Sequence, residues 1–76
     1  MIPLLDLHGV RHEDARRKTI SFVETYWNSN QKVEIITGHS DKMRNVVYKV
    51  LNEYKVEYKL GGELEIDMAK IVVTLD

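Results

Sequence analysis

An aspartate and two histidines stand where their side chains could move protons. Asp6 and His8 are two residues apart in a short apolar segment, so in an extended strand both side chains leave the same face. His39 follows a second apolar segment, directly after Gly38. An imidazole gives or takes a proton near neutral pH, and a carboxylate beside it can fix its tautomer. If the two segments are neighbouring strands, the three side chains converge at one edge of a sheet.

The turn after the second apolar segment is suited to binding an anion. Ser40 or Asp41 is a good N-cap for the helix predicted to follow, and the first N–H groups of a helix lack partners within it. These groups and the helix dipole attract phosphate, and Gly38 lets a phosphate approach the backbone. Ser40 either caps the helix or adds a hydroxyl donor. Lys42 and Arg44 open the same helix, where they either contact phosphate or stay solvated.

The pattern of apolar residues predicts the elements that position these side chains. The order strand, helix, strand, helix, strand, strand is typical of an α/β two-layer sandwich with a four-stranded mixed sheet and two helices. Each of the first two helices should join parallel strands by a right-handed crossover, and ligands bind beyond the carboxyl ends of such strands. We expect the first strand to be buried on both faces. The predicted strands cover residues 3–7, 32–37, 56–59 and 70–75, the helices cover 12 to about 28 and about 41 to 54, and 63–68 is mostly loop.

Length and composition limit the class of protein. The 76 residues suffice for one small domain, there are no cysteines, and no apolar run is long enough to span a bilayer. We therefore expect a cytoplasmic monomer without membrane contact. The net charge is -1, but residues 1–60 carry +2 and residues 61–76 carry -3. A phosphate-binding face can therefore exist on the first part of the chain.

Two short motifs carry a family resemblance. The run Leu5-Asp6-Leu7-His8-Gly9 resembles the motif that opens Smr (small MutS-related) domains, and Ile36-Thr37-Gly38 is similar to that family's second motif. The second motif usually continues Gly-x-Gly, whereas here His39-Ser40 follows Gly38, and Thr37 stands where other members have histidine. The resemblance covers residues 1–76 as a single Smr-like domain. It implies a fold like the C-terminal domain of translation initiation factor three.

The resemblance also implies that the protein nicks or cuts RNA, DNA or both, in the context of a larger protein or of the ribosome. We expect cleavage by acid–base chemistry without a required cofactor, and a divalent metal only if DNA is cut. The predicted catalytic residues are Asp6, His8 and His39, and the predicted phosphate-binding residues are Gly9, Thr37, Gly38, Ser40, Lys42 and Arg44. No metal site is predicted.

Each of these assignments has a structural alternative. Asp6 either orients a histidine or the substrate, or it accepts a hydrogen bond from the glycine-containing turn or a helix end. His8 can be only a turn residue, and His39 only a loop residue near the helix cap. At the level of function, the alternatives are a non-catalytic nucleic-acid-binding module and a protein-interaction domain that uses the exposed strand of the C-terminal hairpin.

Other polar and aromatic residues favour structural roles. His12 is expected at the surface, because Gly9 breaks the helix that metal-ligand spacing from His8 would need. Tyr26 and Trp27 are expected in the core and its boundary rather than as stacking platforms. The basic residues Arg16, Arg17 and Lys18 form either a solvated helix face or a phosphate contact.

Overall fold

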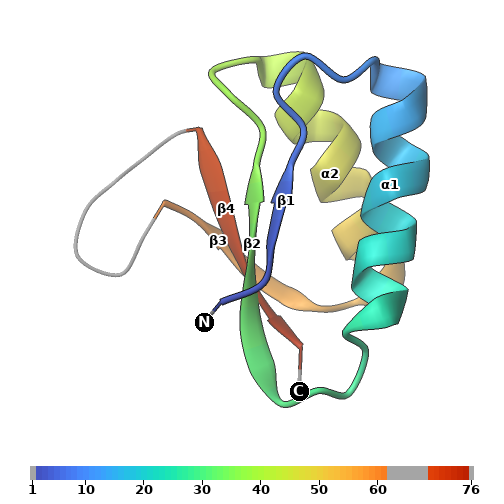
Figure 1. The fold of residues 1–76 in the computed structure, drawn as a ribbon, viewed down its shortest axis with the longest axis vertical. Coiled ribbons are helices and arrows are strands. Elements are labelled where there is room, and N and C mark those ends of the chain that lie inside the picture. The colour runs from blue at the N-terminus through green and yellow to red at the C-terminus, as the bar shows by residue number, and fades with distance from the viewer. Residues whose placement is uncertain (1, 62–68, 76) are drawn as a thin grey trace.

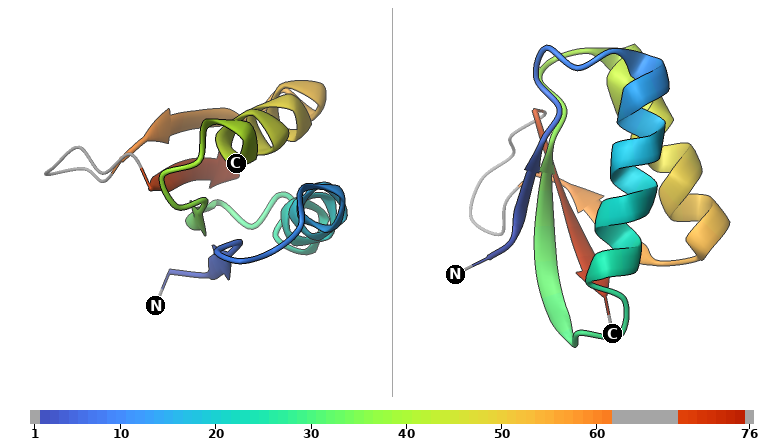
Figure 2. Two further views of the ribbon diagram at one scale, coloured as in Figure 1. Left: turned by 90° about the horizontal axis from the view of Figure 1, so that it is seen from above. Right: turned by 45° about the vertical axis from the view of Figure 1, so that its right-hand side comes forward.

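The computed structural model describes residues 2–61 and 69–75. Its elements follow the predicted order: β1 (Leu4–Asp6), α1 (His12–Thr25), β2 (Gln31–Ile36), α2 (Asp41–Tyr54), β3 (Glu57–Leu60) and β4 (Lys70–Leu75). The four strands form one mixed sheet, and both helices cover the same face of it (Figures 1 and 2). The predicted α/β two-layer sandwich is confirmed. The loop predicted over 63–68 lies outside the described residues.

The sheet has the strand order β1-β2-β4-β3. β1 pairs in parallel with β2, whereas β4 is antiparallel to both β2 and β3. It follows that β3 runs in the same direction as β2, with β4 between them. The parallel direction predicted across each helix is therefore confirmed, and β1 and β2 are direct neighbours, as convergence of the polar residues requires.

The core lies between the helices and the covered face of the sheet. Alternate residues of β2 and β4 point into it, as the period of two along a strand dictates. The apolar stripe of α2 and two small positions of α1 meet them from the other layer. The buried hydrophobic residues of this cluster are Leu7, Ala15, Val23, Val33, Ile35, Met43, Val47, Leu51, Ile71, Val73 and Leu75.

The prediction that the first strand is buried on both faces is wrong. Leu4 is 53% exposed, and Asp6 is exposed as well. β1 is an edge strand, and both helices of the described residues lie on the other face of the sheet from the one that Leu4 and Asp6 occupy (Figure 2). A carboxylate in this strand therefore stays in water, so the cost of burying a charge does not arise at Asp6.

The helix ends follow the capping residues. Ser40 caps α2, and its Oγ accepts a hydrogen bond from the N–H of Met43 at 3.2 Å. Arg11 precedes α1 without a side-chain cap bond. α1 ends at Thr25, before the predicted end near residue 28, and Trp27 beyond it is 46% exposed with its ring edge-on to a tyrosine of α2. Trp27 thus lies at the boundary and not in the core.

The two helices are joined on their exposed sides by polar contacts. Arg16 and Glu53 form an ion pair at 2.8 Å, which raises the pKa of Arg16 and lowers that of Glu53. The Tyr54 hydroxyl donates to the Glu24 carboxylate at 2.8 Å, and this hydrogen bond raises the pKa of Tyr54. Arg16 is therefore engaged in joining the helices. In residues 2–61 and 69–75, neither helix is long and apolar enough to cross a membrane.

Candidate functional site

The two sequence motifs meet where β1 and β2 end. Asp6 is paired with Ile36, and the N–H of Leu7 donates to the carbonyl of Ile36 at 2.8 Å. Just beyond these residues, the segment after β1 turns toward α1 and the segment after β2 turns toward α2. The two turns lie side by side at the top of Figure 1. The Cδ2 atom of His8 lies 3.8 Å from the place where a Cβ on Gly38 would be. The imidazole of His8 is therefore in contact range of the second motif.

The turn of the first motif is held by its own neighbours in the sequence. Oδ1 of Asp6 accepts a hydrogen bond from the backbone N–H of His8 at 2.9 Å, and the carbonyl of Leu7 accepts from the N–H of Val10 at 3.0 Å. Gly9 has φ of +77°, which a residue with a Cβ adopts only under strain. Gly9 thus turns the chain toward α1. This arrangement fixes the backbone that carries the exposed His8 side chain.

The hydrogen bond of Asp6 is therefore the structural one, accepted from the backbone of the glycine-containing turn. Among the hydrogen bonds within residues 2–61 and 69–75, none joins the Asp6 carboxylate to an imidazole. The carboxylate can still act on His8 electrostatically, since the two side chains belong to the same turn. Its observed contribution is to hold the position of the His8 backbone.

The turn of the second motif is anchored on Ala69, the residue before β4. The carbonyl of Ala69 accepts from the N–H of Thr37 at 2.7 Å and from the N–H of Gly38 at 3.2 Å. The Thr37 hydroxyl donates to the Gly38 carbonyl at 2.9 Å and lies 3.3 Å from the Ala69 carbonyl. Thr37 is 3% exposed. Both residues, expected to bind phosphate, direct these polar groups into the protein.

This anchoring corrects one detail of the expected anion site. The Gly38 N–H was expected to face a phosphate, but it is bonded to Ala69. Nothing in the sequence pointed to Ala69, because a backbone carbonyl has no signature in the residue types. Glycine is nevertheless favoured at position 38, since its φ is +71°, a conformation that residues with a Cβ adopt only under strain. The donors that remain for an anion belong to the residues after it.

Those donors are the first N–H groups of α2 and of the turn that leads into it. Within the described part of the chain, the N–H groups of His39, Ser40, Asp41 and Lys42 have no hydrogen-bond partner. They lie at the positive end of a helix of 14 residues. His39 and Lys42 are both exposed. Free backbone donors at the positive end of a helix are a favourable place for an anion.

Arg44 lies beneath this turn. It is 8% exposed, its guanidinium pairs with the Asp41 carboxylate, and Nη1 lies 3.5 Å from the Gly38 carbonyl. These contacts brace the turn from inside and offset the charge of Asp41 at the helix start. The guanidinium is engaged with protein groups, and its expected contact with phosphate remains a prediction. Lys42, in contrast, is exposed.

The site carries no cluster of metal ligands in the part of the chain that the structure describes. Within residues 2–61 and 69–75, no three histidine, cysteine, aspartate or glutamate side chains gather closely enough to hold a metal ion. The structure brings His8 into contact range of the Gly38 turn, and that turn leads through His39 into α2.

Comparison with known families agrees with the resemblance that the two motifs carry. The family model for the Smr domain matches residues 5–75, which is essentially the whole chain. The chain belongs to the Smr domain family. Smr domains are associated with nuclease activity and nucleic-acid binding. Neither the search of curated proteins nor the search of solved structures found a match.

Proposed function

We propose that this Smr domain is an endonuclease that cleaves phosphodiester bonds by acid–base catalysis. The observation that carries the proposal is the contact range between His8 and the Gly38 turn, which brings an exposed imidazole to the anion-binding start of α2. A second exposed imidazole, His39, lies on that turn. Two imidazoles and a place for phosphate are what general acid–base cleavage needs.

In this proposal the scissile phosphate lies against the N–H groups of His39 to Lys42. These donors and the Lys42 ammonium stabilise the charge that grows on the phosphate oxygens in the transition state. Thr37, Gly38 and Arg44 shape the turn that presents the donors, and Gly9 shapes the turn that presents His8. The phosphate-binding role is thus concentrated on the first turn of α2.

RNA is the substrate that this arrangement fits best. His8 takes the proton from the 2′-hydroxyl, whose oxygen attacks the adjacent phosphorus. The bond from phosphorus to the 5′-oxygen breaks, and His39 gives that oxygen a proton. The products are a 2′,3′-cyclic phosphate and a 5′-hydroxyl. DNA lacks this internal nucleophile, so its cleavage would need an activated water, which a divalent metal bound by the Asp6 carboxylate would supply.

Product ends test the proposal. Labelled RNA and DNA are incubated with the purified chain, with and without a chelator, across a range of pH. We expect RNA fragments with a cyclic phosphate and a 5′-hydroxyl, formed equally in chelator, and a bell-shaped pH profile from two imidazoles. Products with a 5′-phosphate, formed without the chelator but not in its presence, would contradict the two-histidine scheme and favour Asp6 as a metal ligand.

A non-catalytic nucleic-acid-binding module is the second candidate. It is favoured by the Asp6 carboxylate, which bonds the backbone of His8 and not its imidazole. Such a module binds RNA or DNA with the same groups and yields no products at any protein concentration. Loss of affinity in Lys42→Gln without any cleavage by the parent chain identifies it. A larger protein or the ribosome would then supply the chemistry or the targeting.

A further inference from the structure

A groove of about 420 Å³ lies between β1 and α1. It is at the edge of the sheet, where no strand of the described residues lies beyond β1. β1 ends at the candidate site, and α1 starts there and runs back along β1 (Figure 1). Among the lining residues of α1, Lys18 lies nearest to the start of the helix and Tyr26 lies just beyond its end. The Lys18 end of the groove is therefore the end nearer to the candidate site.

Lys18 brings an unpaired positive charge to this groove. Within residues 2–61 and 69–75, its exposed ammonium has no ion pair or hydrogen bond. The carboxylate one turn before it on the helix, Asp14, is paired with Arg17 at 3.1 Å. Asp6 leaves the opposite face of β1 from Leu5, which lines the groove. None of the described residues that line the groove is acidic, so the groove favours an anion near Lys18.

The rest of the groove is suited to a nucleoside. Leu5, Phe22 and Tyr26 supply apolar and aromatic surface, and the two rings pack edge to face with their centroids 5.2 Å apart. Ser21 adds an exposed hydroxyl beside them. Nucleic-acid bases stack on aromatic side chains whatever their sequence, and serine hydroxyls bond to sugar and phosphate oxygens. A phosphate at Lys18 and a base farther along the groove together match one nucleotide.

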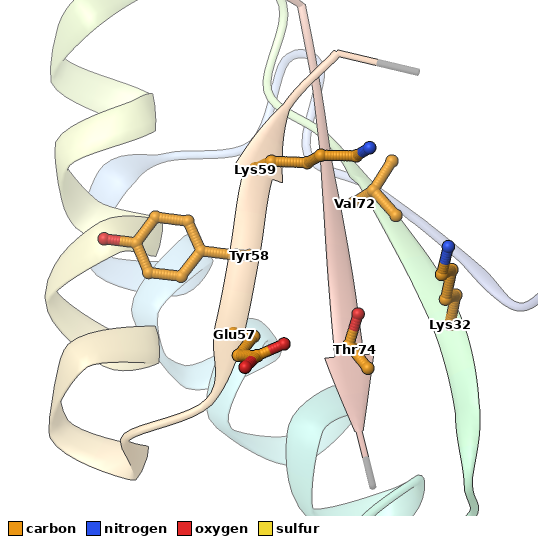
Figure 3. A pocket seen from close by; sticks show the side chains of 6 residues that line it. All are labelled: Lys32, Glu57, Tyr58, Lys59, Val72 and Thr74. Carbon is orange, nitrogen blue, oxygen red and sulfur yellow. The ribbon is translucent and has the colours of Figure 1, made fainter. Parts of the chain in front are cut away.

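A hollow over β4, on the face of the sheet opposite the two helices, is less suited to a phosphate (Figure 3). Lys32 and Lys59 line it, but Lys32 is already engaged with another group. The carboxylate of Glu57 lies in the same hollow. The groove beside β1 therefore has the more favourable charge for nucleic acid.

We infer that the groove between β1 and α1 holds a nucleotide of the bound RNA outside the cleaved bond, with its phosphate at Lys18 and its base against Phe22 and Tyr26. This inference rests on the proposed function and gives the substrate a course from the start of α2 along the edge of the sheet. A contact remote from the reacting atoms binds the ground state and the transition state equally. Its loss therefore raises KM and leaves kcat unchanged.

The first test compares Lys18→Gln with Lys49→Gln, which removes an exposed lysine from α2. Each variant cleaves a dinucleotide without terminal phosphates and a longer single-stranded RNA. The single phosphate of the dinucleotide must lie at the start of α2 to be cleaved, so none is left for Lys18. We expect Lys18→Gln to raise KM for the longer RNA by about two- to fivefold, the range for one exposed ionic contact, with kcat unchanged.

Both constants for the dinucleotide stay at the parental values, and the control keeps them for both substrates. Equal effects of Lys18→Gln on the two substrates would overturn the inference, because Lys18 would then act on the cleaved phosphate itself.

The second test measures binding of labelled single-stranded RNA over a series of salt concentrations. A His8→Ala background keeps the RNA intact. We expect Lys18→Gln to make the slope of log affinity against log salt shallower by about 0.7, the value for one single-strand phosphate. Ser21→Glu, which places a carboxylate in the groove at an exposed position, weakens binding as well.

Three results of the binding test overturn the inference in distinguishable ways. If Lys18→Gln keeps the parental slope while Lys42→Gln makes it shallower, nucleic acid binds at α2 without entering the groove, and the proposed function stands. If sedimentation shows a dimer that Ser21→Glu dissociates, a second copy of the chain covers the groove. If the parent chain binds neither RNA nor DNA, the proposed function itself fails and this inference with it.

Discussion

The two turns that meet at the candidate site are held in different ways. The turn that carries His8 is closed by two hydrogen bonds between residues close in sequence. The His8 N–H donates to the Asp6 carboxylate, and the Val10 N–H donates to the Leu7 carbonyl. The turn that carries His39 is anchored on Ala69, 32 residues farther along the chain from Thr37. The first turn is local and exposed, whereas the second is tied to the last strand of the sheet.

This difference separates residues expected to act in the reaction from residues that hold the turns in place. A change at His8 removes an exposed side chain from a turn that its neighbours hold in place. A change at Thr37 alters a buried contact between β2 and the start of β4. We therefore expect substitutions in the first turn to affect turnover with little effect on stability, and substitutions in the second to affect stability first.

The largest expected effect is on turnover in His8→Ala. Loss of one general acid–base group should slow RNA cleavage by about 10² to 10⁴. The midpoint of urea unfolding should stay close to that of the parent, because the side chain is exposed. His12→Ala, an exposed histidine at the start of α1, is the matched control and should retain activity. Full activity in His8→Ala would remove His8 from the mechanism.

A smaller effect, on stability, is expected in Thr37→Val. The buried hydroxyl bonds the carbonyls of Gly38 and Ala69, and their loss should lower the free energy of unfolding by about 1 to 2 kcal/mol. Thr25→Val is the control, since its hydroxyl bonds the Ser21 carbonyl at the surface, and it should change stability by less than about 0.5 kcal/mol. Urea unfolding measures both. Equal losses would mean that the Ala69 anchor contributes no more than a surface bond.

The smallest effect is expected on the cleavage rate of Asp6→Asn, and it tests what Asp6 contributes to the first turn. The amide oxygen can still accept from the His8 N–H, so activity should fall by less than about tenfold, the difference of about 1 kcal/mol between a charged and a neutral acceptor. Asp6→Ala removes the acceptor and should cost more.

The scheme based on sequence alone predicts the opposite for Asp6→Asn. If the carboxylate orients the imidazole, the amide frees the histidine tautomer and the loss is severe. Rates of RNA cleavage for the asparagine and alanine variants, side by side, decide between a backbone role and an electrostatic one. Equal and severe losses would restore the electrostatic role.

The sequence was sufficient to predict the frame of the site. Apolar periodicity gave the six elements, and the two parallel strands that carry the motifs are neighbours, as the expected meeting of Asp6, His8 and His39 requires. Residue type and position predicted Ser40 or Asp41 as the cap of α2, and Ser40 is the one that caps it. Each of these features depends on residues close in the chain, where local geometry sets the outcome.

The features that could not be predicted depend on strand order and distant contacts. Leu4 is exposed because β1 lies at an edge, which the apolar pattern of β1 alone does not show. The Gly38 N–H donates to the carbonyl of Ala69. Arg44, which was expected either to contact phosphate or to stay solvated, is buried and paired with Asp41. Backbone partners 30 residues away have no signal in a single sequence.

The anchor on Ala69 has a consequence for the order in which the protein becomes complete during synthesis. β1, α1, β2 and α2 all leave the ribosome before β4, the strand that lies between β2 and β3. Until residues 69–75 emerge, the Thr37–Gly38 turn lacks the carbonyl that closes it, and β2 lacks its antiparallel partner. A pairing so distant in sequence forms late. The nascent chain therefore carries both motifs for some time before it can hold them together.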